Sequence, residues 1–334
     1  MNREDIDPKE MERLTNPEAK LLFLLKYASI APSSHNTQPW RLRINSNTIE
    51  IKPEFKRRLV YSDSKDRQLY LSLGTCIENL LLASKAYGFT FDLQIKNDES
   101  SVYALISYSN LQLNLIDYTT LESIIARASN RELFEDRPVP DEFVEKLKLI
   151  AGSKAEISFV TDQAQRTKII DVVGTSIQDA FLDKQFTNEL SGWIKPSLKK
   201  YQLGMPGYNV GIPWPLSFVM PWVIGHVKMD KTQRKMDEAP LRAAPMFVLL
   251  SNDSDEPTSW IQVGQVFEEI AVEADKIGLK IGIQGAPIEI GDHYKTLGQL
   301  FGAKGRPMIF FRIGFTSKNK PKSPRLLVNQ LIEQ

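Results

Sequence analysis

The sequence predicts an α+β protein in which two copies of one unit share a core as an intramolecular pseudo-dimer. Three observations carry this prediction. The chain has 334 residues, or about two domains at roughly 150 residues each. Helical and strand-like patterns alternate, and the order restarts near residue 116. Two helices framed by glycines also occur with matching spacing, one in each part of the chain.

The first unit is expected over residues 1–115. Asn16 before Pro17 is typical of a helix start, because the asparagine side chain can cap the helix and proline suits its first position. In order, the patterns predict a helix at 17–31, a hairpin at 40–52 that turns at 45–47, a second long helix at 68–87, and two strands at 90–109.

The second unit is expected over residues 116–334. Its patterns predict helices at 121–128 and 141–151, a strand at 156–161, an interrupted helix at 165–200, a strand at 245–251, a helix at 258–278, and a strand at 307–314. Residues 201–225 are rich in Gly, Pro, Trp and Tyr, which favours an insertion that acts as a lid or an interface arm.

The glycine-framed helices are the sequence evidence for duplication. Gly74 and Gly88 flank the first, and Gly264 and Gly278 flank the second at the same spacing. A glutamate follows the first glycine of each by four residues. Such a duplication lets one chain form what two chains form in a symmetric dimer, so we expect two antiparallel-type sheets flanked by helices.

Composition excludes several classes of protein. Lys and Arg number 42 and Asp and Glu 41, so the net charge is +1, and no basic stripe for nucleic acid is visible. Cys76 is the one cysteine, and the three histidines lack metal-site spacing, so we expect neither a disulfide nor a metal site. The polar first residues and the absence of a long apolar run favour a cytoplasmic protein without a membrane partner.

Two polar segments are candidates for ligand binding. Residues 32–40, PSSHNTQPW, place hydroxyls, amides and an imidazole between prolines, which suits hydrogen bonding to a ring ligand; the alternative is a plain helix end closed by turn residues. Residues 127–134, RASNRELF, place two arginines four apart at a helix end, which suits a dianion; the alternative is an ion pair between Arg131 and Glu135.

Two further segments lie late in the chain. Residues 320–325, KPKSPR, are a cationic cluster with a backbone fixed by prolines; the alternative is a solvated tail. Residues 285–289, GAPIE, are expected as a loop after a short strand, where backbone amides could meet a ligand. Neither a G-x-G-x-x-G nor a G-x-S-x-G motif occurs, which disfavours a Rossmann dinucleotide domain and an α/β-hydrolase.

Taken together, RASNRELF, SSHNTQPW, PIE and KSPR resemble the motifs of the nitroreductase family of FMN-dependent oxidoreductases over residues 16–330. Here the serine loop precedes the arginine segment, as in the two-repeat, Acg-like branch of that family, whose chain resembles a fused pseudo-dimer. The first half lacks the arginine motif and the second lacks N-x-Q-P-W, so the resemblance implies one FMN site per chain. Ile290, where many relatives have glycine, and the extra residue in KSPR depart from the pattern.

The resemblance implies a set of FMN-binding residues and no catalytic side chain, since the flavin carries the chemistry. Arginine, lysine and serine side chains would neutralise the phosphate, Arg131 or Lys322 would face the flavin N1 and C2=O, and the PIE backbone would lie beside the ring. The implied residues are Pro32, Ser33, Ser34, Asn36, Gln38, Arg127, Ser129, Arg131, Pro287, Ile288, Glu289, Lys322 and Arg325.

The function implied is the NAD(P)H-dependent, two-electron reduction of nitroaromatic or quinone-like acceptors through bound FMN, with NAD(P)H as a transient reductant. The alternative is a protein that sequesters or stores flavin, its ring covered by the aromatic insertion through Tyr201, Tyr208, Trp214 and Trp222. The expected partner is a small-molecule substrate. The chain is expected to be a monomer with an internal pseudo-dimer, or a homodimer.

Overall fold

The first part of the chain forms a four-stranded antiparallel sheet with helices beside it. The computed structural model describes residues 5–198, 200–318 and 321–333, so 1–4, 199, 319–320 and 334, which the predicted units include, lie outside the described residues. The elements are η2 (Pro8–Arg13), α1 (Pro17–Ser29), η3 (Ser34–Asn36), β1 (Trp40–Asn45), β2 (Thr48–Pro53), η4 (Phe55–Arg57), α2 (Arg67–Ala86), β3 (Thr90–Asn97) and β4 (Val102–Asn110). The sheet order is β1-β2-β4-β3.

The second part forms another four-stranded antiparallel sheet, with the order β5-β8-β10-β9. Its elements are α3 (Tyr118–Ala126), α4 (Asp141–Ala151), β5 (Glu156–Val160), β8 (Met246–Asn252), α9 (Pro257–Lys276), β9 (Leu279–Ile283), α10 (Ala286–Glu289), α11 (His293–Phe301) and β10 (Arg306–Phe315). The two sheets have the same topology. In each, the first strand along the chain lies at one edge, followed across the sheet by the second, the fourth and the third. The predicted α+β class with two repeated sheets is confirmed.

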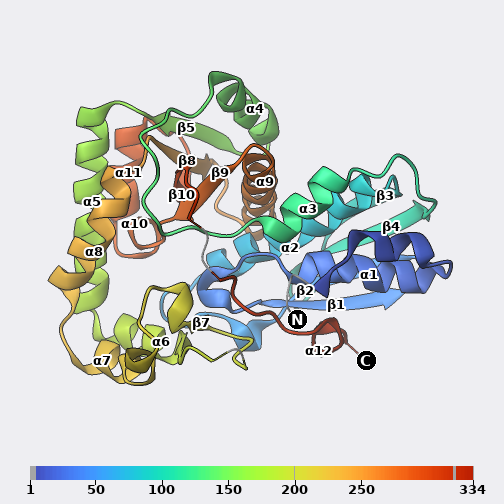
Figure 1. The fold of residues 1–334 in the computed structure, drawn as a ribbon, viewed down its shortest axis with the longest axis horizontal. Helices are drawn as coiled ribbons and strands as arrows, with labels where there is room; N and C mark the ends of the chain where they lie inside the picture. Colours follow the sequence, from blue (N-terminus) through green and yellow to red (C-terminus); the bar gives the residue numbers. More distant parts are fainter. Residues whose placement is uncertain (1–4, 199, 319–320, 334) are drawn as a thin grey trace.

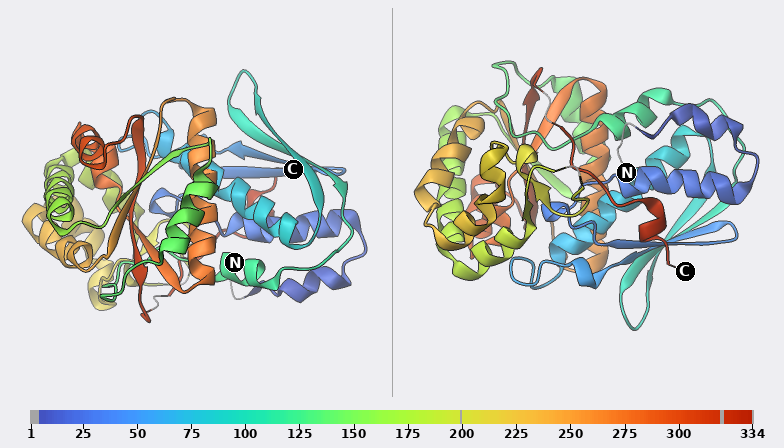
Figure 2. Two further views of the ribbon diagram at one scale, coloured as in Figure 1. Left: turned by 90° about the horizontal axis from the view of Figure 1, so that it is seen from above. Right: turned by 60° about the horizontal axis from the view of Figure 1, so that its bottom comes forward.

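Helices α2 and α9 lie between the two sheets and pack on each other (Figures 1 and 2). They are the two helices that the glycine spacing singled out. A Cβ on Gly74 would lie 2.1 Å from the Ile261 carbonyl oxygen, and a Cβ on Gly264 would lie 2.1 Å from the Leu71 carbonyl oxygen. The two contacts are equivalent under the repeat, so both glycines let the helix backbones touch.

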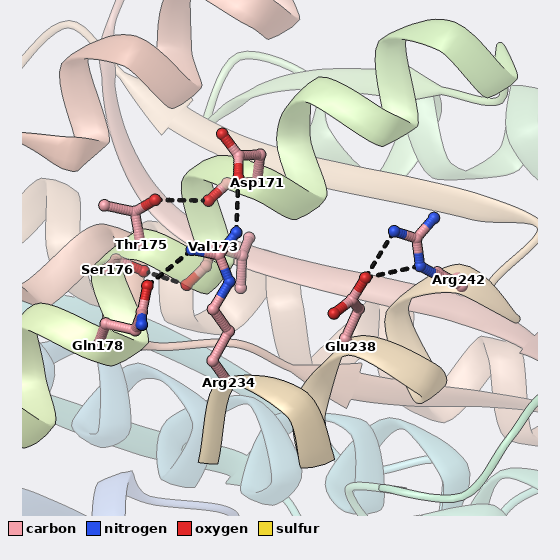
Figure 3. A network of polar contacts seen from close by, with 8 residues as sticks. All are labelled: Asp171, Val173, Thr175, Ser176, Gln178, Arg234, Glu238 and Arg242. Atoms are coloured by element: carbon pink, nitrogen blue, oxygen red, sulfur yellow. Dashed lines mark hydrogen bonds and ion pairs between the residues drawn. The ribbon is translucent and has the colours of Figure 1, made fainter. Parts of the chain in front are cut away.

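A large helical insertion separates β5 from β8. It comprises α5 (Gln163–Leu182), α6 (Lys184–Trp193), β6 (Ile194–Lys195), β7 (Met205–Pro206), η5 (Gly207–Asn209), η6 (Pro215–Phe218), α7 (Met220–His226) and α8 (Asp230–Arg242). The insertion is therefore longer than the predicted 201–225. Arg234 on α8 donates to Gln178 and Asp171 on α5, each at 2.6 Å, which holds the two outer helices together (Figure 3).

The C-terminal segment returns to the first sheet and closes the structure. After β10 it runs past the serine loop to the short helix α12 (Val328–Leu331) (Figure 1). There Ile332 bridges to Leu42 of β1, and Glu333 accepts from Arg41 at 3.1 Å. The last residues of the second half thus pack on the first. The division between residues 115 and 116 stays a prediction.

Candidate functional site

One cavity of about 330 Å³ brings together residues from all four motif segments. The polar segments lie far apart in the sequence, and they meet here because the N-terminal half of α2, strand β9 and the C-terminal segment converge. The predicted residues that line the cavity are Pro32, Ser33, Ser34, Asn36, Arg127, Ser129, Arg131, Ile288, Glu289 and Arg325. Their roles toward a cofactor stay predictions.

The serine loop is held in a strained conformation above α2. His35, Asn36 and Gln38 have φ angles of 50°, 56° and 49°, in the left-handed region that non-glycine residues rarely adopt. Ser33 Oγ accepts from the Gln38 amide at 2.9 Å, and Ser34 Oγ donates to Gln68 Oε1 at 3.1 Å. The surrounding contacts therefore fix an unfavourable loop in place, as is common where a loop must present polar atoms to a ligand.

Two amides of this loop connect it to the rest of the site. Asn36 Nδ2 faces the carbonyl oxygens of Gln202, Gly204 and Pro324 at 2.9–3.2 Å. Gln38 is buried, donates to the Gln202 carbonyl at 2.7 Å and accepts from the Leu326 amide at 2.9 Å. Gln38 does not line the cavity, and its contacts position the loop; its predicted contact with the cofactor stays a prediction.

Two other predicted residues also lie outside the cavity lining. Pro287 is buried in α10, whereas its neighbours on either side face the cavity. Lys322 Nζ donates to the Ile125 carbonyl at 2.8 Å, next to the arginine segment. Lys320, at the start of the predicted cationic cluster, lies outside the described residues.

The arginine segment differs from its predicted form. Arg127 caps α3 with extended backbone, so Arg127 and Arg131 do not share a helix face. Ser129 instead bridges in parallel to Ile281, and the Asn130 amide donates to the Ile281 carbonyl at 2.7 Å. The segment continues the edge of the second sheet beyond β9, and this places both arginines at the cavity. Arg131 donates to the Asn209 carbonyl at 3.1 Å, which replaces the alternative pair with Glu135.

Buried charges converge at one end of the cavity. Arg127 Nε lies 2.9 Å from Glu268 Oε1, and both side chains are almost fully buried. Arg325 Nε donates to the Ala31 carbonyl at 3.2 Å, which joins the C-terminal segment to the end of α1. Burial and then the charge of Arg127 lower the pKa of Arg325 to about 9, while Glu268 opposes the shift. An anion bound here would relieve this repulsion between the two guanidinium groups.

The GAPIE segment is helical, not the predicted loop: α10 covers Ala286–Glu289. Burial, followed by the charges of Asp63 and Glu189, raises the pKa of Glu289 to about 8. Ile290, which departs from the family pattern, packs with the apolar cluster of the insertion and does not line the cavity.

We expect Glu289 to make stability fall as pH rises. Its pKa is about 8 in the folded chain and ordinary, near 4.5, in the unfolded chain, so between these values only the folded state holds the proton. The free energy of unfolding should drop by up to about 1.4 kcal/mol per pH unit over this window. Urea unfolding at several pH values measures it, and Glu289→Gln should flatten the slope. Equal slopes in the two proteins would contradict the assignment.

Several cavity-lining residues were not predicted. His35 lies within the recognised loop motif, and its presence there was the available signal. Burial lowers its pKa to about 4, so the imidazole is neutral near pH 7. From the insertion, Phe186, Met205 and Asn209 line the cavity, whereas the suggested cover residues Trp214 and Trp222 are each 61% exposed to solvent. None of Tyr201, Tyr208, Trp214 or Trp222 lines the cavity.

Two features are absent from the described part of the chain. No helix there is long and apolar enough to cross a membrane. Within the same residues, no cluster of His, Cys, Asp or Glu is arranged to hold a metal ion.

Comparison with known proteins identifies the relatives of the chain. No protein-family model matches it. A Mycobacterium tuberculosis protein, provisionally named as an NAD(P)H nitroreductase, is 24% identical over 328 residues and covers 95% of this chain and 92% of its own length. Acg of the same organism, with the same provisional designation, is 20% identical over 324 residues and covers 92% and 93%. Over nearly its whole length the chain is therefore similar to proteins named as NAD(P)H nitroreductases. The family resemblance seen in the motifs is confirmed.

Solved structures that resemble part of the chain carry related names. The FMN-dependent nitroreductase NfnB from Mycobacterium smegmatis, in complex with NADPH, covers 64% of this chain and 96% of its own at 12% identity and a TM-score of 0.43. The NADPH:FMN oxidoreductase from Vibrio harveyi, complexed with NAD+, covers 65% and 76% at 14% identity and a TM-score of 0.40.

Proposed function

We propose that this chain binds FMN in the cavity and uses NAD(P)H to reduce small aromatic acceptors, such as nitroaromatics or quinones. The observation that carries the proposal is the mixed lining of the cavity. The buried cations Arg127 and Arg325 line it together with a group of apolar side chains and with the polar side chains of the serine loop. The names of the full-length relatives, NAD(P)H nitroreductases, agree with this reading.

The residues present fit FMN. The cavity volume of about 330 Å³ is in the range of small-molecule pockets, roughly 300–1,000 Å³. A flat ring suits the apolar wall and a phosphate suits the cationic end. Two buried polar atoms in the described loop, His35 Nδ1 and Asn36 Oδ1, find no protein partner, as expected of groups that meet a ligand. The apolar wall consists of Phe267, Ile283, Ile288, Met308 and Phe310.

The proposed roles follow the positions of the side chains. Arg127, Ser129 and Arg325 would bind the phosphate, and Ser33, Ser34 and Asn36 would bind polar groups from the opposite half of the chain. Arg131 would place a positive charge near the ring. Neutral His35 would offer a hydrogen bond without adding a charge.

FMN would supply the redox chemistry, because it accepts two electrons from NAD(P)H and passes them to the acceptor. The protein would orient the ring and limit the access of water. The helical insertion contributes Phe186 and Met205 to the cavity wall, so it covers one side of the space. Its tryptophans Trp214 and Trp222 are exposed and do not line the cavity, which favours turnover over flavin storage.

Anaerobic reduction tests the function. Purified protein loaded with FMN should be yellow, and NADPH or NADH should bleach its absorbance near 450 nm. Adding menadione or nitrofurazone should restore the colour and sustain NAD(P)H oxidation. Bound flavin that neither coenzyme bleaches would support the storage alternative. A protein that takes up no FMN would contradict both.

Replacing Arg131 tests one cofactor contact at small structural cost, because this side chain is exposed toward the cavity. Loss of one charge-assisted hydrogen bond is worth about 1.5–3 kcal/mol, so Arg131→Ala should weaken FMN binding roughly 10- to 100-fold. Quenching of flavin fluorescence on titration measures the dissociation constant. Arg43→Ala, an exposed arginine on β1, is the matched control and should bind as wild type. Unchanged affinity in Arg131→Ala would remove Arg131 from the site.

A further inference from the structure

A second cavity of about 220 Å³ adjoins the proposed FMN cavity. The two share three lining residues, Gln68 on α2 and Ile288 and Glu289 on α10. We call the second space the outer cavity. A ligand long enough to pass these residues would reach both spaces at once.

The outer cavity carries positive charge from three separate elements. Lys65 lies in the loop before α2, Arg67 in the first turn of α2, and Arg306 at the start of β10. The Arg306 guanidinium lies 3.7 Å from the centre of the Tyr294 ring, so a stacked cation and an aromatic surface form part of the wall. Cations suit a phosphate group, and a flat aromatic surface beside them suits a heterocyclic base. The wall therefore fits a ligand that contains both groups.

The two arginines are fixed before any ligand arrives. Asp255 accepts from Arg67 Nε at 2.8 Å and from Arg67 Nη2 at 2.7 Å, and Arg306 Nε lies 3.8 Å from the same carboxylate. One carboxylate thus orients two guanidinium groups and offsets one of their charges. Lys65 is exposed and adds a further positive charge.

Two acids also line the outer cavity, and of these Asp63 is mostly ionised near pH 7 whereas Glu289 is not. Burial raises the pKa of Asp63 to about 6, and the Asp63 carboxylate accepts from the Leu69 amide at 2.9 Å at the start of α2. Glu289, with a pKa of about 8, is mostly uncharged near pH 7. The three basic residues therefore exceed the ionised acids on this wall.

We propose that the outer cavity binds the adenosine end of the nicotinamide dinucleotide and favours the form with a 2′-phosphate, NADPH. This proposal rests on the proposed function, because the nicotinamide must reach the flavin in the adjoining cavity. The phosphates would meet Lys65 and Arg306, and the base would lie near Tyr294. Nitroaromatic and quinone acceptors have no anionic tail, so their chemistry gives the three cations nothing to bind.

Fragments of the coenzyme test this without any redox step. Adenosine 2′,5′-bisphosphate and AMP are titrated into FMN-loaded and FMN-free protein by calorimetry. We expect the bisphosphate to bind at least about tenfold more tightly than AMP, because its additional phosphate gains a charge-assisted contact. Lys65→Ala should reduce this preference about tenfold. Lys96→Ala, an exposed lysine on β3, is the control and should leave it unchanged.

A second variant separates charge from geometry. Arg306→Lys keeps the charge and loses the planar group that stacks on Tyr294. It should therefore lower the affinity for the bisphosphate less than Arg306→Gln does. In flavin-loaded protein, Lys65→Ala should also lower the ratio of kcat/KM for NADPH to that for NADH.

The outcomes distinguish the two proposals. Equal binding of the bisphosphate and AMP, or an unchanged preference in Lys65→Ala, would overturn the outer-cavity proposal even if NADPH bleaches the flavin. Conversely, protein that takes up no FMN fails the proposed function, while tight, Lys65-dependent binding of the bisphosphate would still support the anion site.

Discussion

Arg127→Ala should lower the free energy of unfolding by about 3–5 kcal/mol, which is typical when one partner of a buried ion pair is removed. Arg127 and Glu268 are 4% and 0% exposed, and their charged atoms lie 2.9 Å apart. Without the guanidinium, Glu268 loses its ion-pair partner in the core, which makes its buried charge costlier and favours uptake of a proton. Guanidinium or urea unfolding, followed by circular dichroism, measures the loss.

The rescue variant separates stability from cofactor binding. In Arg127→Ala/Glu268→Gln the carboxylate that lost its partner is replaced by a neutral amide, so much of the lost stability should return. If Arg127 also binds the FMN phosphate, this folded double variant should still bind FMN far more weakly than wild type. Wild-type stability in Arg127→Ala would contradict the ion-pair argument. Wild-type FMN affinity in the rescued protein would remove Arg127 from the phosphate site.

The fold of the first half could be predicted because its signals are local. The hairpin 40–52 has a short turn between alternating residues, and the observed strands β1 and β2 differ from it by one residue at the end. The helix predicted at about 141–151 in the second half is α4 (Asp141–Ala151). In both places the signals from capping residues, turn residues and apolar spacing lie within a few residues of one another and predict the same element.

The insertion was harder to predict, because its sequence signals conflict. Helix α8 runs over Asp230–Arg242 with Pro240 inside it, and just one of its residues, Leu241, is buried. A polar sequence with an internal proline does not indicate a helix. Packing against α5, including the Arg234 contacts, stabilises it instead.

The sequence motifs identified candidate site residues, but they did not predict the contacts that these residues make in the folded chain. The motifs predicted Arg127 as a phosphate ligand. Its ion-pair partner Glu268 lies on α9, far along the chain, and was not predicted. Gln38 was proposed to contact the cofactor, and the fold turns it toward Gln202 and Leu326. Both outcomes depend on tertiary packing between the two halves, which local patterns do not contain. The outer cavity has the same origin, since Lys65 and Arg306 meet only in three dimensions.

The glycine pair of the central helices makes the second strong prediction. Gly74→Ala or Gly264→Ala would place a methyl group 2.1 Å from a backbone carbonyl oxygen of the opposite helix. Backbone cannot swing aside as a flexible side chain can, so α2 and α9 must move apart. We expect each substitution to cost about 3 kcal/mol or more, at or above the upper end for overpacking. Urea unfolding measures the cost.

Gly192→Ala is the matched control, because Gly192 lies in α6 and an added Cβ there meets no atom within 4 Å. That change should be neutral or stabilise the protein by up to about 1 kcal/mol, as alanine favours a helix over glycine. Since Gly74 and Gly264 lie at the same helix crossing, the double variant should cost less than the sum of the single ones: the first methyl group already separates the helices. Strict additivity, or single variants as stable as wild type, would show that α2 and α9 do not depend on this close crossing.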